Sequence, residues 1–299
     1  MKIYLPRKLN RSYINDLMKN IVGKDLKPTH QELSFDFTNL SFIEPSGITT
    51  LGNTFEWLVK NGTKTSITIP NKIGLNRHCP IKYLDDSEFF LRFTGNKLED
   101  DSSVRPTTIP LQKVTYENSH QWLTGTFTPW LAHRLGVRNS VLGNIEMCLG
   151  EIFNNIIDHS TENLGCIFAQ HFPGQNRLVI SIADFGIGIP ENIRKINKEV
   201  DDAEALELAI QEGVSSKTSP RNMGAGLYTL IRNVVLSTES SVNIHSGYGI
   251  LNTYFGNDNI DISSEIADGY YPGTFLEVNI DTNVLLEEDK EEYEEEFVW

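Results

Sequence analysis

The spacing of apolar and polar positions predicts two structured regions, of which the first is small and layered. Residues 33–37 and 66–70 alternate apolar with polar side chains, which predicts two half-buried strands. Between them, apolar residues recur at helical spacing from Ile48 to Val59, and the pair Asn61-Gly62 supplies a helix stop signal. Residues 83–93 form a second helical stretch. This order of strand, helix and strand predicts an α/β layer domain.

A linker at residues 95–110 leads into the second region, which opens with a long amphipathic helix. Its apolar face consists of Leu142, Ile145, Leu149, Ile152 and Ile156. Later strands are predicted at 177–185, 242–246, 250–255 and 273–280, with a helix at 226–236. We therefore expect an α+β domain with helices on one face of a mixed sheet. The long polar stretch 190–223 has few apolar anchors and one short helix at 203–213, which is typical of a lid.

Composition changes this picture little. The chain has 299 residues, of which 39% are hydrophobic and 22% charged, which is typical of a globular protein of two domains. No apolar run in the first residues could be a signal peptide or membrane span, so we expect a cytoplasmic protein without membrane contact. Cysteine is found at positions 79, 148 and 166 without CxxC spacing, which predicts neither disulfides nor a zinc knuckle.

The net charge of -14 is concentrated at one end. Residues 287–296 hold seven Glu, one Asp and one Lys, a net charge of -7, which is half of the net charge of the chain. We expect the tail, residues 286–299, to be solvated and mobile, with docking to a basic surface as the alternative. No basic cluster interleaved with aromatic residues occurs, which argues against a nucleic-acid partner. A protein partner, a second copy or a small molecule is expected instead.

Three short motifs carry candidate chemistry. On the long helix, Glu151, Asn155 and His159 follow at steps of four and form one polar stripe. The alternative is that this stripe is the solvent-exposed face that any amphipathic helix has. DFGIGIP, starting at Asp184, follows a strand, and its glycines permit close backbone approach. NMGAGLYTL places glycines directly before a helix, whose free N–H groups suit phosphate oxygens.

The order of these motifs resembles that of the GHKL ATPases, which have the Bergerat fold, an α/β sandwich. EIFNNIIDHS resembles the N-box of that family, which implies that Glu151 is the general base and that Asn155 is the Mg²⁺ ligand. Asp158 and His159 belong to the same box and are expected to contact the cofactor. An amide oxygen together with the phosphates of ATP suits Mg²⁺, which prefers oxygen donors.

The other boxes complete the implied ATP site. DFGIGIP resembles the G1 box, in which Asp184 would accept the adenine amine, and NMGAGLYTL resembles the G2 box. GTFLEV supplies Thr274 where the family has a Thr that supports the adenine Asp, and Lys217 is either a cation for the terminal phosphate or an ordinary loop lysine. The remaining implied cofactor contacts are Gly186, Gly188, Gly224, Gly226 and Leu227. The resemblance covers residues 108–285 and implies ATP and Mg²⁺ as cofactors.

The first region, residues 1–107, resembles a STAS domain, the fold of anti-sigma-factor antagonists. The resemblance lies in residues 33–62, with Ser46 before Gly47 at the acceptor position of that family, although Glu44 and Pro45 depart from the usual Asp and Ser. Ser46 is either a phosphoacceptor or the cap of the helix that follows.

The two resemblances together imply a regulatory protein. GHKL domains serve serine kinases that act on STAS proteins, histidine kinases and ATP-gated clamps. A STAS-like flank favours a serine kinase or ATPase switch of the partner-switching kind. The alternative is an ATP-gated interaction or dimerisation module that hydrolyses ATP slowly or not at all.

Overall fold

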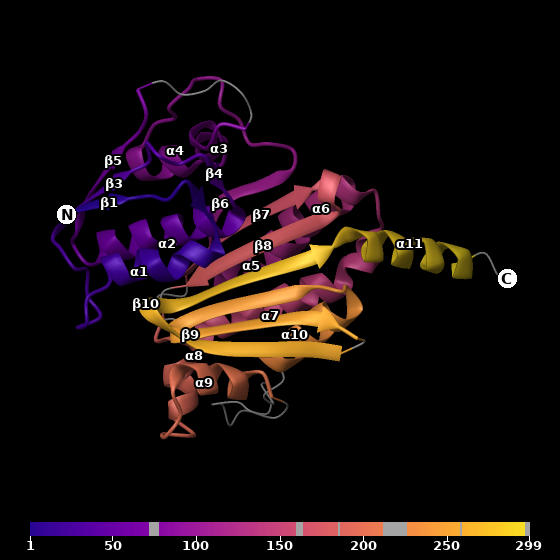
Figure 1. Ribbon diagram of the computed structural model, residues 1–299. Helices are drawn as coiled ribbons and strands as arrows, with labels where there is room; N and C mark the ends of the chain where they lie inside the picture. The colour runs from indigo at the N-terminus through magenta and orange to yellow at the C-terminus, as the bar shows by residue number, and fades with distance from the viewer. Residues whose placement is uncertain (72–77, 160–163, 185, 212–225, 258, 297–299) are drawn as a thin grey trace.

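The N-terminal layer of the computed structural model is built on a parallel sheet (Figure 1). The structure describes residues 1–71, 78–159, 164–184, 186–211, 226–257 and 259–296. The sheet has the order β1-β3-β5, and a parallel β2-β4 pair lies beside it. The strands are β1 (Lys2–Tyr4), β2 (Lys8–Leu9), β3 (Glu32–Asp36), β4 (Phe42–Ile43) and β5 (Lys64–Thr68). The helices are α1 (Ile14–Ile21), α2 (Pro45–Lys60), α3 (Pro80–Asp86) and α4 (Phe89–Thr94).

Helix α2 follows the predicted bounds for local reasons. Glu44 is its extended N-cap residue, and Pro45 occupies the first helical position, where its missing N–H costs no hydrogen bond. Gly62, with a φ of +71°, follows the helix end. The predicted helix at 83–93 is instead divided into α3 and α4, because Glu88 adopts a left-handed φ of +64° between them.

The C-terminal sheet has five strands in the order β6-β7-β8-β10-β9, and every pairing among its described residues is antiparallel. The expectation of a mixed sheet was therefore wrong. Its strands are β6 (Thr108–Thr115), β7 (Leu164–Phe172), β8 (Arg177–Asp184), β9 (Ser241–Gly256) and β10 (Asn259–Asp281). The reason lies in the connections: β7 and β8 are joined by the 3-10 turn Pro173–Gln175, and β9 runs directly into β10. Strands joined by tight turns pair antiparallel.

Strand β9 folds back on itself near Gly247, whose φ is +59°. The Phe255 N–H donates to the Ser240 carbonyl at 3.1 Å, and the Thr253 hydroxyl donates to the Val242 carbonyl at 3.1 Å. The two halves of β9 are thus neighbours, and they correspond to the two strands that were predicted separately at 242–246 and 250–255. Strand β10 follows this bend on the outside, with register shifts between Ile266 and Thr274.

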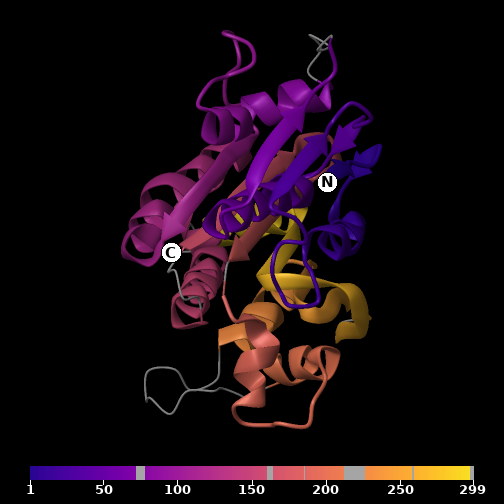
Figure 2. The ribbon, with the colours of Figure 1, turned by 90° about the vertical axis from the view of Figure 1, so that its left-hand side faces the viewer.

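The two faces of this sheet are covered by different parts of the chain, as Figures 1 and 2 show. One face packs against α7 and α10, and the other packs against α1 and α2 of the N-terminal layer. The C-terminal helices are α5 (Tyr116–Trp122), α6 (Thr128–Leu135), α7 (Gly143–His159), α8 (Gly188–Arg194), α9 (Asp202–Ala209), α10 (Gly226–Ser237) and α11 (Thr282–Glu296). A π-helical turn, Leu123–Phe127, joins α5 to α6, and further 3-10 turns lie at Arg11–Tyr13 and Asn139–Leu142.

The predicted linker is held in place at its first half. The carboxylate of Asp85, which is 2% exposed, accepts hydrogen bonds from the Leu98 N–H at 2.9 Å and the Glu99 N–H at 3.0 Å, and it also accepts from the Ser102 hydroxyl. Strand β6 then begins at Thr108. The segment therefore connects the two layers along a fixed path.

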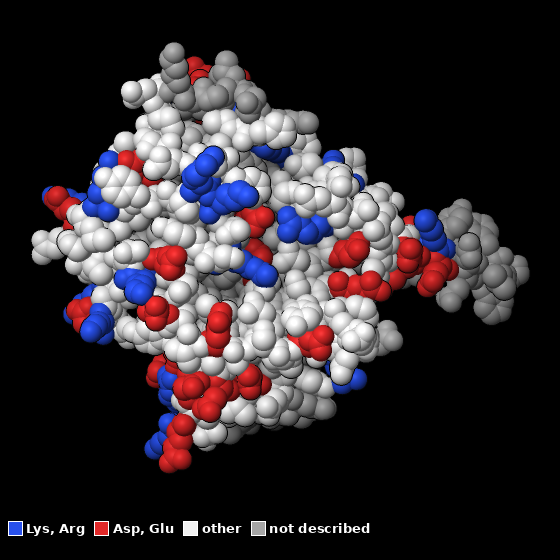
Figure 3. Space-filling view, in the orientation of Figure 1, with Lys and Arg blue, Asp and Glu red and all other residues white. Residues whose placement is uncertain are grey.

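The acidic tail is helical and begins as part of the folded structure. Helix α11 starts at Thr282 and continues to Glu296, with Leu285 only 1% exposed. Arg138 donates from its backbone N–H and from Nε to the carboxylate of Asp289, at 2.9 and 3.1 Å. The expectation of a mobile tail was therefore wrong as far as Asp289. Acidic side chains gather over the first part of α11 and again over α9 (Figure 3).

No helix among the residues that the structure describes is both long enough and apolar enough to cross a membrane.

Candidate functional site

The candidate site lies where β8 ends beside the bends of β10 and β9. Asp184 is the last residue of β8, and the sheet register places Thr274 of β10 next to it and Ser246 of β9 opposite Thr274. Side chains alternate along a strand, so Asp184 points to the same face as Ile180 and Ile182, the face that packs against α7 and α10. The three polar side chains therefore form a row on the helix-covered face.

Hydrogen bonds tie this row together. The Thr274 N–H donates to Asp184 Oδ1 at 3.3 Å, and the hydroxyls of Thr274 and Ser246 lie 3.0 Å apart. The Ser246 hydroxyl donates to the Gly273 carbonyl at 2.8 Å and accepts from the Ile189 N–H at 2.9 Å. Ser246 thus fixes both the turn before Thr274 and the start of α8.

Two glycines are required by the tightness of this junction. Gly188 has a φ of +79°, and a Cβ there would lie 2.8 Å from the Ser246 hydroxyl. Gly273 has a φ of +110°, and a Cβ there would lie 2.3 Å from the Asp184 carbonyl and 2.8 Å from the Gly186 N–H. Only glycine combines a positive φ with so little space. The DFGIGIP and GTFLEV motifs therefore meet at their glycines.

The Asp184 carboxyl is poised as a hydrogen-bond acceptor. It is 8% exposed, and burial raises its pKa to about 7, with the Thr274 N–H as an opposing influence. Among the described residues, the Thr274 N–H is the one donor to its carboxylate oxygens. The carboxylate therefore has acceptor capacity for a further N–H group, such as an amine.

Helix α7 carries the predicted N-box beside this row. It packs against α10 and also contacts α8, and Glu151 lies half-buried on it. Burial, followed by the charge of Glu151, raises the pKa of Cys148 to about 12. Asn155, Asp158 and His159 occupy the last turns of α7, but their side chains lie outside the described residues.

The predicted phosphate-binding segment is described only from Gly226 onward. Gly226 is the first residue of α10, and Leu227 packs against the core shared with α7. Lys217 and Gly224 lie outside the described residues. No group of three His, Cys, Asp or Glu side chains that could hold a metal ion occurs among the residues that the structure describes.

The first part of the predicted lid is anchored to the sheet. Ile193, Ala205 and Leu206 are buried, so the expectation that residues 191–223 have few apolar anchors was wrong as far as residue 211. A capping box starts α9, and Asp202 accepts hydrogen bonds from the Tyr248 N–H at 2.6 Å and from Arg194. The rest of the segment, 212–225, is not described.

The N-terminal layer reaches this site from the other side of the sheet. Asn53 of α2 donates from Nδ2 to the carbonyl of Asp184 at 3.1 Å and to the hydroxyl of Tyr271 at 2.8 Å. One turn earlier on α2, the Thr49 hydroxyl donates to the Ser181 carbonyl of β8 at 3.3 Å. Neither Asn53 nor Ser246 stood out in the sequence, because each acts through residues far away along the chain.

Ser46 is buried against the sheet and does not cap α2. The cap residue is Glu44, without a side-chain cap bond, so the interpretation of Ser46 as the helix cap was wrong. Ser46 has no exposed surface, and its hydroxyl makes no hydrogen bond to another described residue. Phosphorylation of Ser46 would therefore require α2 to leave the sheet.

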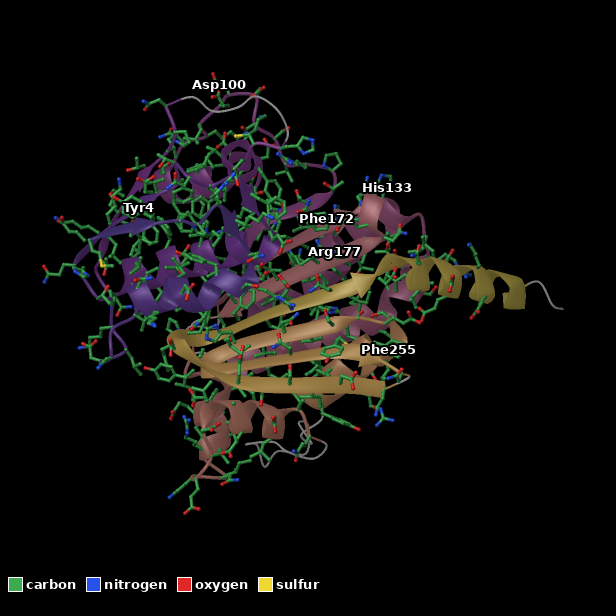
Figure 4. The ribbon with its side chains drawn as sticks, viewed as in Figure 1. Tyr4, Asp100, His133, Phe172, Arg177 and Phe255 are labelled. Carbon is green, nitrogen blue, oxygen red and sulfur yellow. The ribbon has the colours of Figure 1, made fainter. Side chains whose placement is uncertain are left out.

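His133, the histidine nearest before the N-box, lies at the opposite end of the sheet. Figure 4 shows it on α6, at the end of the sheet where Arg177 begins β8, and burial, together with the charge of the neighbouring Arg134, lowers the pKa of His171 on β7. Asp184 is at the other end of β8 from Arg177. His133 is thus far from the candidate site along the strand.

Comparison of the sequence with models of known protein families gives no match, and comparison with curated proteins gives none at the threshold used.

Proposed function

We propose that residues 108–285 bind ATP with Mg²⁺ in the manner of a GHKL domain of Bergerat fold. One observation carries the proposal: a buried carboxylate, Asp184, ends an inner strand beside a glycine turn and Thr274, on the sheet face that the N-box helix covers. The free acceptor capacity of Asp184 suits the exocyclic amine of adenine. The start of α10 at Gly226 suits phosphate oxygens.

The residue types of the motifs fit this ligand in their chemistry. Adenine needs an acceptor for its amine and a backbone that approaches the ring, and Asp184, Gly186 and Gly188 offer both. Asn155 on α7 would hold Mg²⁺ against the phosphates, and Glu151 would take the proton of the attacking nucleophile. Lys217 would add a cation near the terminal phosphate.

The N-terminal layer, residues 1–107, is the basis on which we propose a regulatory role. A STAS-like layer joined to a GHKL-type ATPase supports a serine kinase or ATPase switch of the partner-switching kind, with a protein or a second copy as partner. The presence of Glu151 favours phosphoryl transfer or hydrolysis, because a protein that only binds ATP needs no base.

A second candidate is an ATP-gated interaction module. The contact between Asn53 and Asp184 and the burial of Ser46 favour it, because they link the N-terminal layer to the nucleotide site while withholding the acceptor hydroxyl. In this function ATP would change how firmly α2 is docked, and hydrolysis would be slow or absent.

Calorimetric titration with Mg-ATP tests the pocket. Asp184→Asn should lower ATP affinity about 10- to 100-fold, because an amide presents an N–H₂ group where the amine needs an acceptor. Asp261→Asn, which changes an exposed carboxylate on β10, is the matched control. Equal ATP affinity in the wild type and a folded Asp184→Asn variant would refute the pocket.

Glu151→Gln separates the two candidates. For the switch with turnover, this change should reduce ATP turnover about 100-fold or more while ATP still binds. For the gated module, wild-type turnover is already near zero and the change has no effect. Measurement of released and protein-bound phosphate with labelled ATP and Mg²⁺ distinguishes them.

A further inference from the structure

Asn53 is the point at which the N-terminal layer contacts the acidic residue of the candidate site. It is 2% exposed, and both hydrogen atoms of its side-chain amide are used, on the Asp184 carbonyl at 3.1 Å and on the Tyr271 hydroxyl at 2.8 Å. These two partners lie on different strands, β8 and β10, and are separated from Asn53 by more than a hundred residues. A single side chain from α2 therefore joins the end of β8 to the irregular middle part of β10.

The helix that supplies Asn53 is closely fitted to the sheet. Thr49 bonds to the carbonyl of Ser181, and at Gly52 an added Cβ would lie 2.7 Å from Leu111 of β6. Ile48 and Leu51 are fully buried. The position of Asn53 along the sheet is therefore fixed by its neighbours on α2, and the amide cannot shift without moving the helix.

The contact acts on the backbone that aims the Asp184 carboxylate. Asp184 is the last residue of β8. Asn53 holds its carbonyl, and the Thr274 N–H holds its carboxylate oxygen at 3.3 Å. If the bond from Asn53 is lost, the Asp184 backbone loses a fixed point, and of these two bonds only the one from the Thr274 N–H still positions the carboxylate.

We infer that Asn53 is a positioning residue for recognition of the nucleobase. Through its bond to the Asp184 carbonyl, the N-terminal layer sets the selectivity of the nucleotide site for adenine over guanine. The inference rests on the proposed function and deepens it. Adenine presents an amine donor where guanine presents a carbonyl acceptor, so a correctly aimed carboxylate favours ATP and repels GTP. The coupling is reciprocal, and ATP binding in turn holds α2 on the sheet.

The test compares ATP and GTP affinities of folded variants by calorimetry. Asn53→Leu removes both donors at nearly constant size, and Thr49→Val removes a hydrogen bond of the same helix to the same strand without touching Asp184. Asn53→Leu should lower ATP affinity about three- to tenfold, leave weak GTP binding unchanged, and so reduce the ATP-to-GTP ratio by the same factor. Thr49→Val should leave the ratio unchanged. A purely structural role would lower the folded fraction and leave the ratio intact.

The outcomes separate this inference from the proposed function. If the wild type binds no ATP, the proposed function fails. If the wild type binds ATP and Asp184→Asn does not, but Asn53→Leu keeps the wild-type ratio, only the role of Asn53 is overturned. Hydrogen exchange of the wild type gives a second measurement that needs no variant. ATP should slow exchange in α2, and equal exchange with and without ATP would overturn the inference as well.

Discussion

Both faces of the five-stranded sheet bury apolar clusters, and the face under α2 adds polar side chains to its cluster. Along β8, Ile180 and Ile182 point to the face that packs against α7 and α10, and the core there consists of apolar side chains. Ser181, between them, points to the other face, where α2 presents Thr49 and Asn53. The strand β8 therefore contributes side chains to two different interfaces.

The faces also differ in how well their polar groups are paired. On the α2 side, the hydroxyls of Ser46, Thr50 and Ser181 are buried without a hydrogen-bond partner among the described residues. Burial of an unpaired hydroxyl costs free energy, whereas burial of an isoleucine side chain contributes about 1.5 to 3 kcal/mol. Both faces gain stability from their apolar clusters, which on the α2 side include Phe168, Tyr271 and Phe275, but the unpaired hydroxyls reduce that gain on the α2 side.

This difference explains why the nucleotide site can be sensitive to the N-terminal layer. The unpaired hydroxyls lower the cost of separating α2 from the sheet, and the same interface includes the bond from Asn53 to Asp184. A change at the site that acts on this bond would then alter how firmly α2 is docked.

Substitutions at adjacent residues of β8 give the largest expected contrast. Ile180→Ala should destabilise the protein by about 2 to 5 kcal/mol, because it leaves a cavity in the apolar core. Ser181→Ala should be nearly neutral, because its hydroxyl is unpaired. Urea unfolding of both variants checks this, and equal losses would contradict the division between the two faces.

The pH dependence of stability is the next largest effect. Burial raises the pKa of Asp184 to about 7, so the folded state holds a proton that the unfolded state releases near pH 4. Stability from this group is present at low pH and is lost as pH rises through about 7. Between pH 6 and 8 the wild type should lose about 1.4 kcal/mol relative to Asp184→Asn, which has no such group.

Urea titrations of both proteins at several pH values measure that difference directly. Burial lowers the pKa of His245 to about 4, but both proteins contain this residue, so its contribution to the pH dependence cancels in the difference. ATP affinity should rise over the same pH interval in the wild type, because the ionised carboxylate is the better acceptor. A difference in stability that stays constant from pH 6 to 8 would show that Asp184 is not the titrating group.

Local patterns were sufficient for the elements that position the site. Apolar residues at helical spacing predicted α2 and α7, and the strand predicted at 177–185 placed Asp184 of the DFGIGIP motif at the end of β8. Strand β7 was not predicted, although LGCIFAQHF has a nearly continuous apolar run that suits a strand buried on both faces.

The contacts that complete the site had no local signal. Ser246 gains its partners only when β9 lies beside β10, and Asn53 reaches Asp184 across 131 residues of sequence. On α2, a polar stripe of Ser, Thr and Asn is typical of an exposed helix face. It is buried here because the opposite face of the same helix packs on the N-terminal sheet, and periodicity cannot reveal a second covering layer.

The smallest expected effect concerns Ser46, the predicted phosphoacceptor. Ser46→Ala should change stability by no more than about 1 kcal/mol and in the stabilising direction, because it removes a buried, unpaired hydroxyl and improves helix propensity. Since that hydroxyl has no exposed surface, it should be phosphorylated only when α2 leaves the sheet. Mass spectrometry after incubation with Mg-ATP should therefore find more phosphate on Ser46 in the loosened Asn53→Leu variant than in the wild type. Equal incorporation in the two proteins would mean that docking of α2 does not protect Ser46, and no incorporation in either, with or without candidate partners, would leave the gated module as the function.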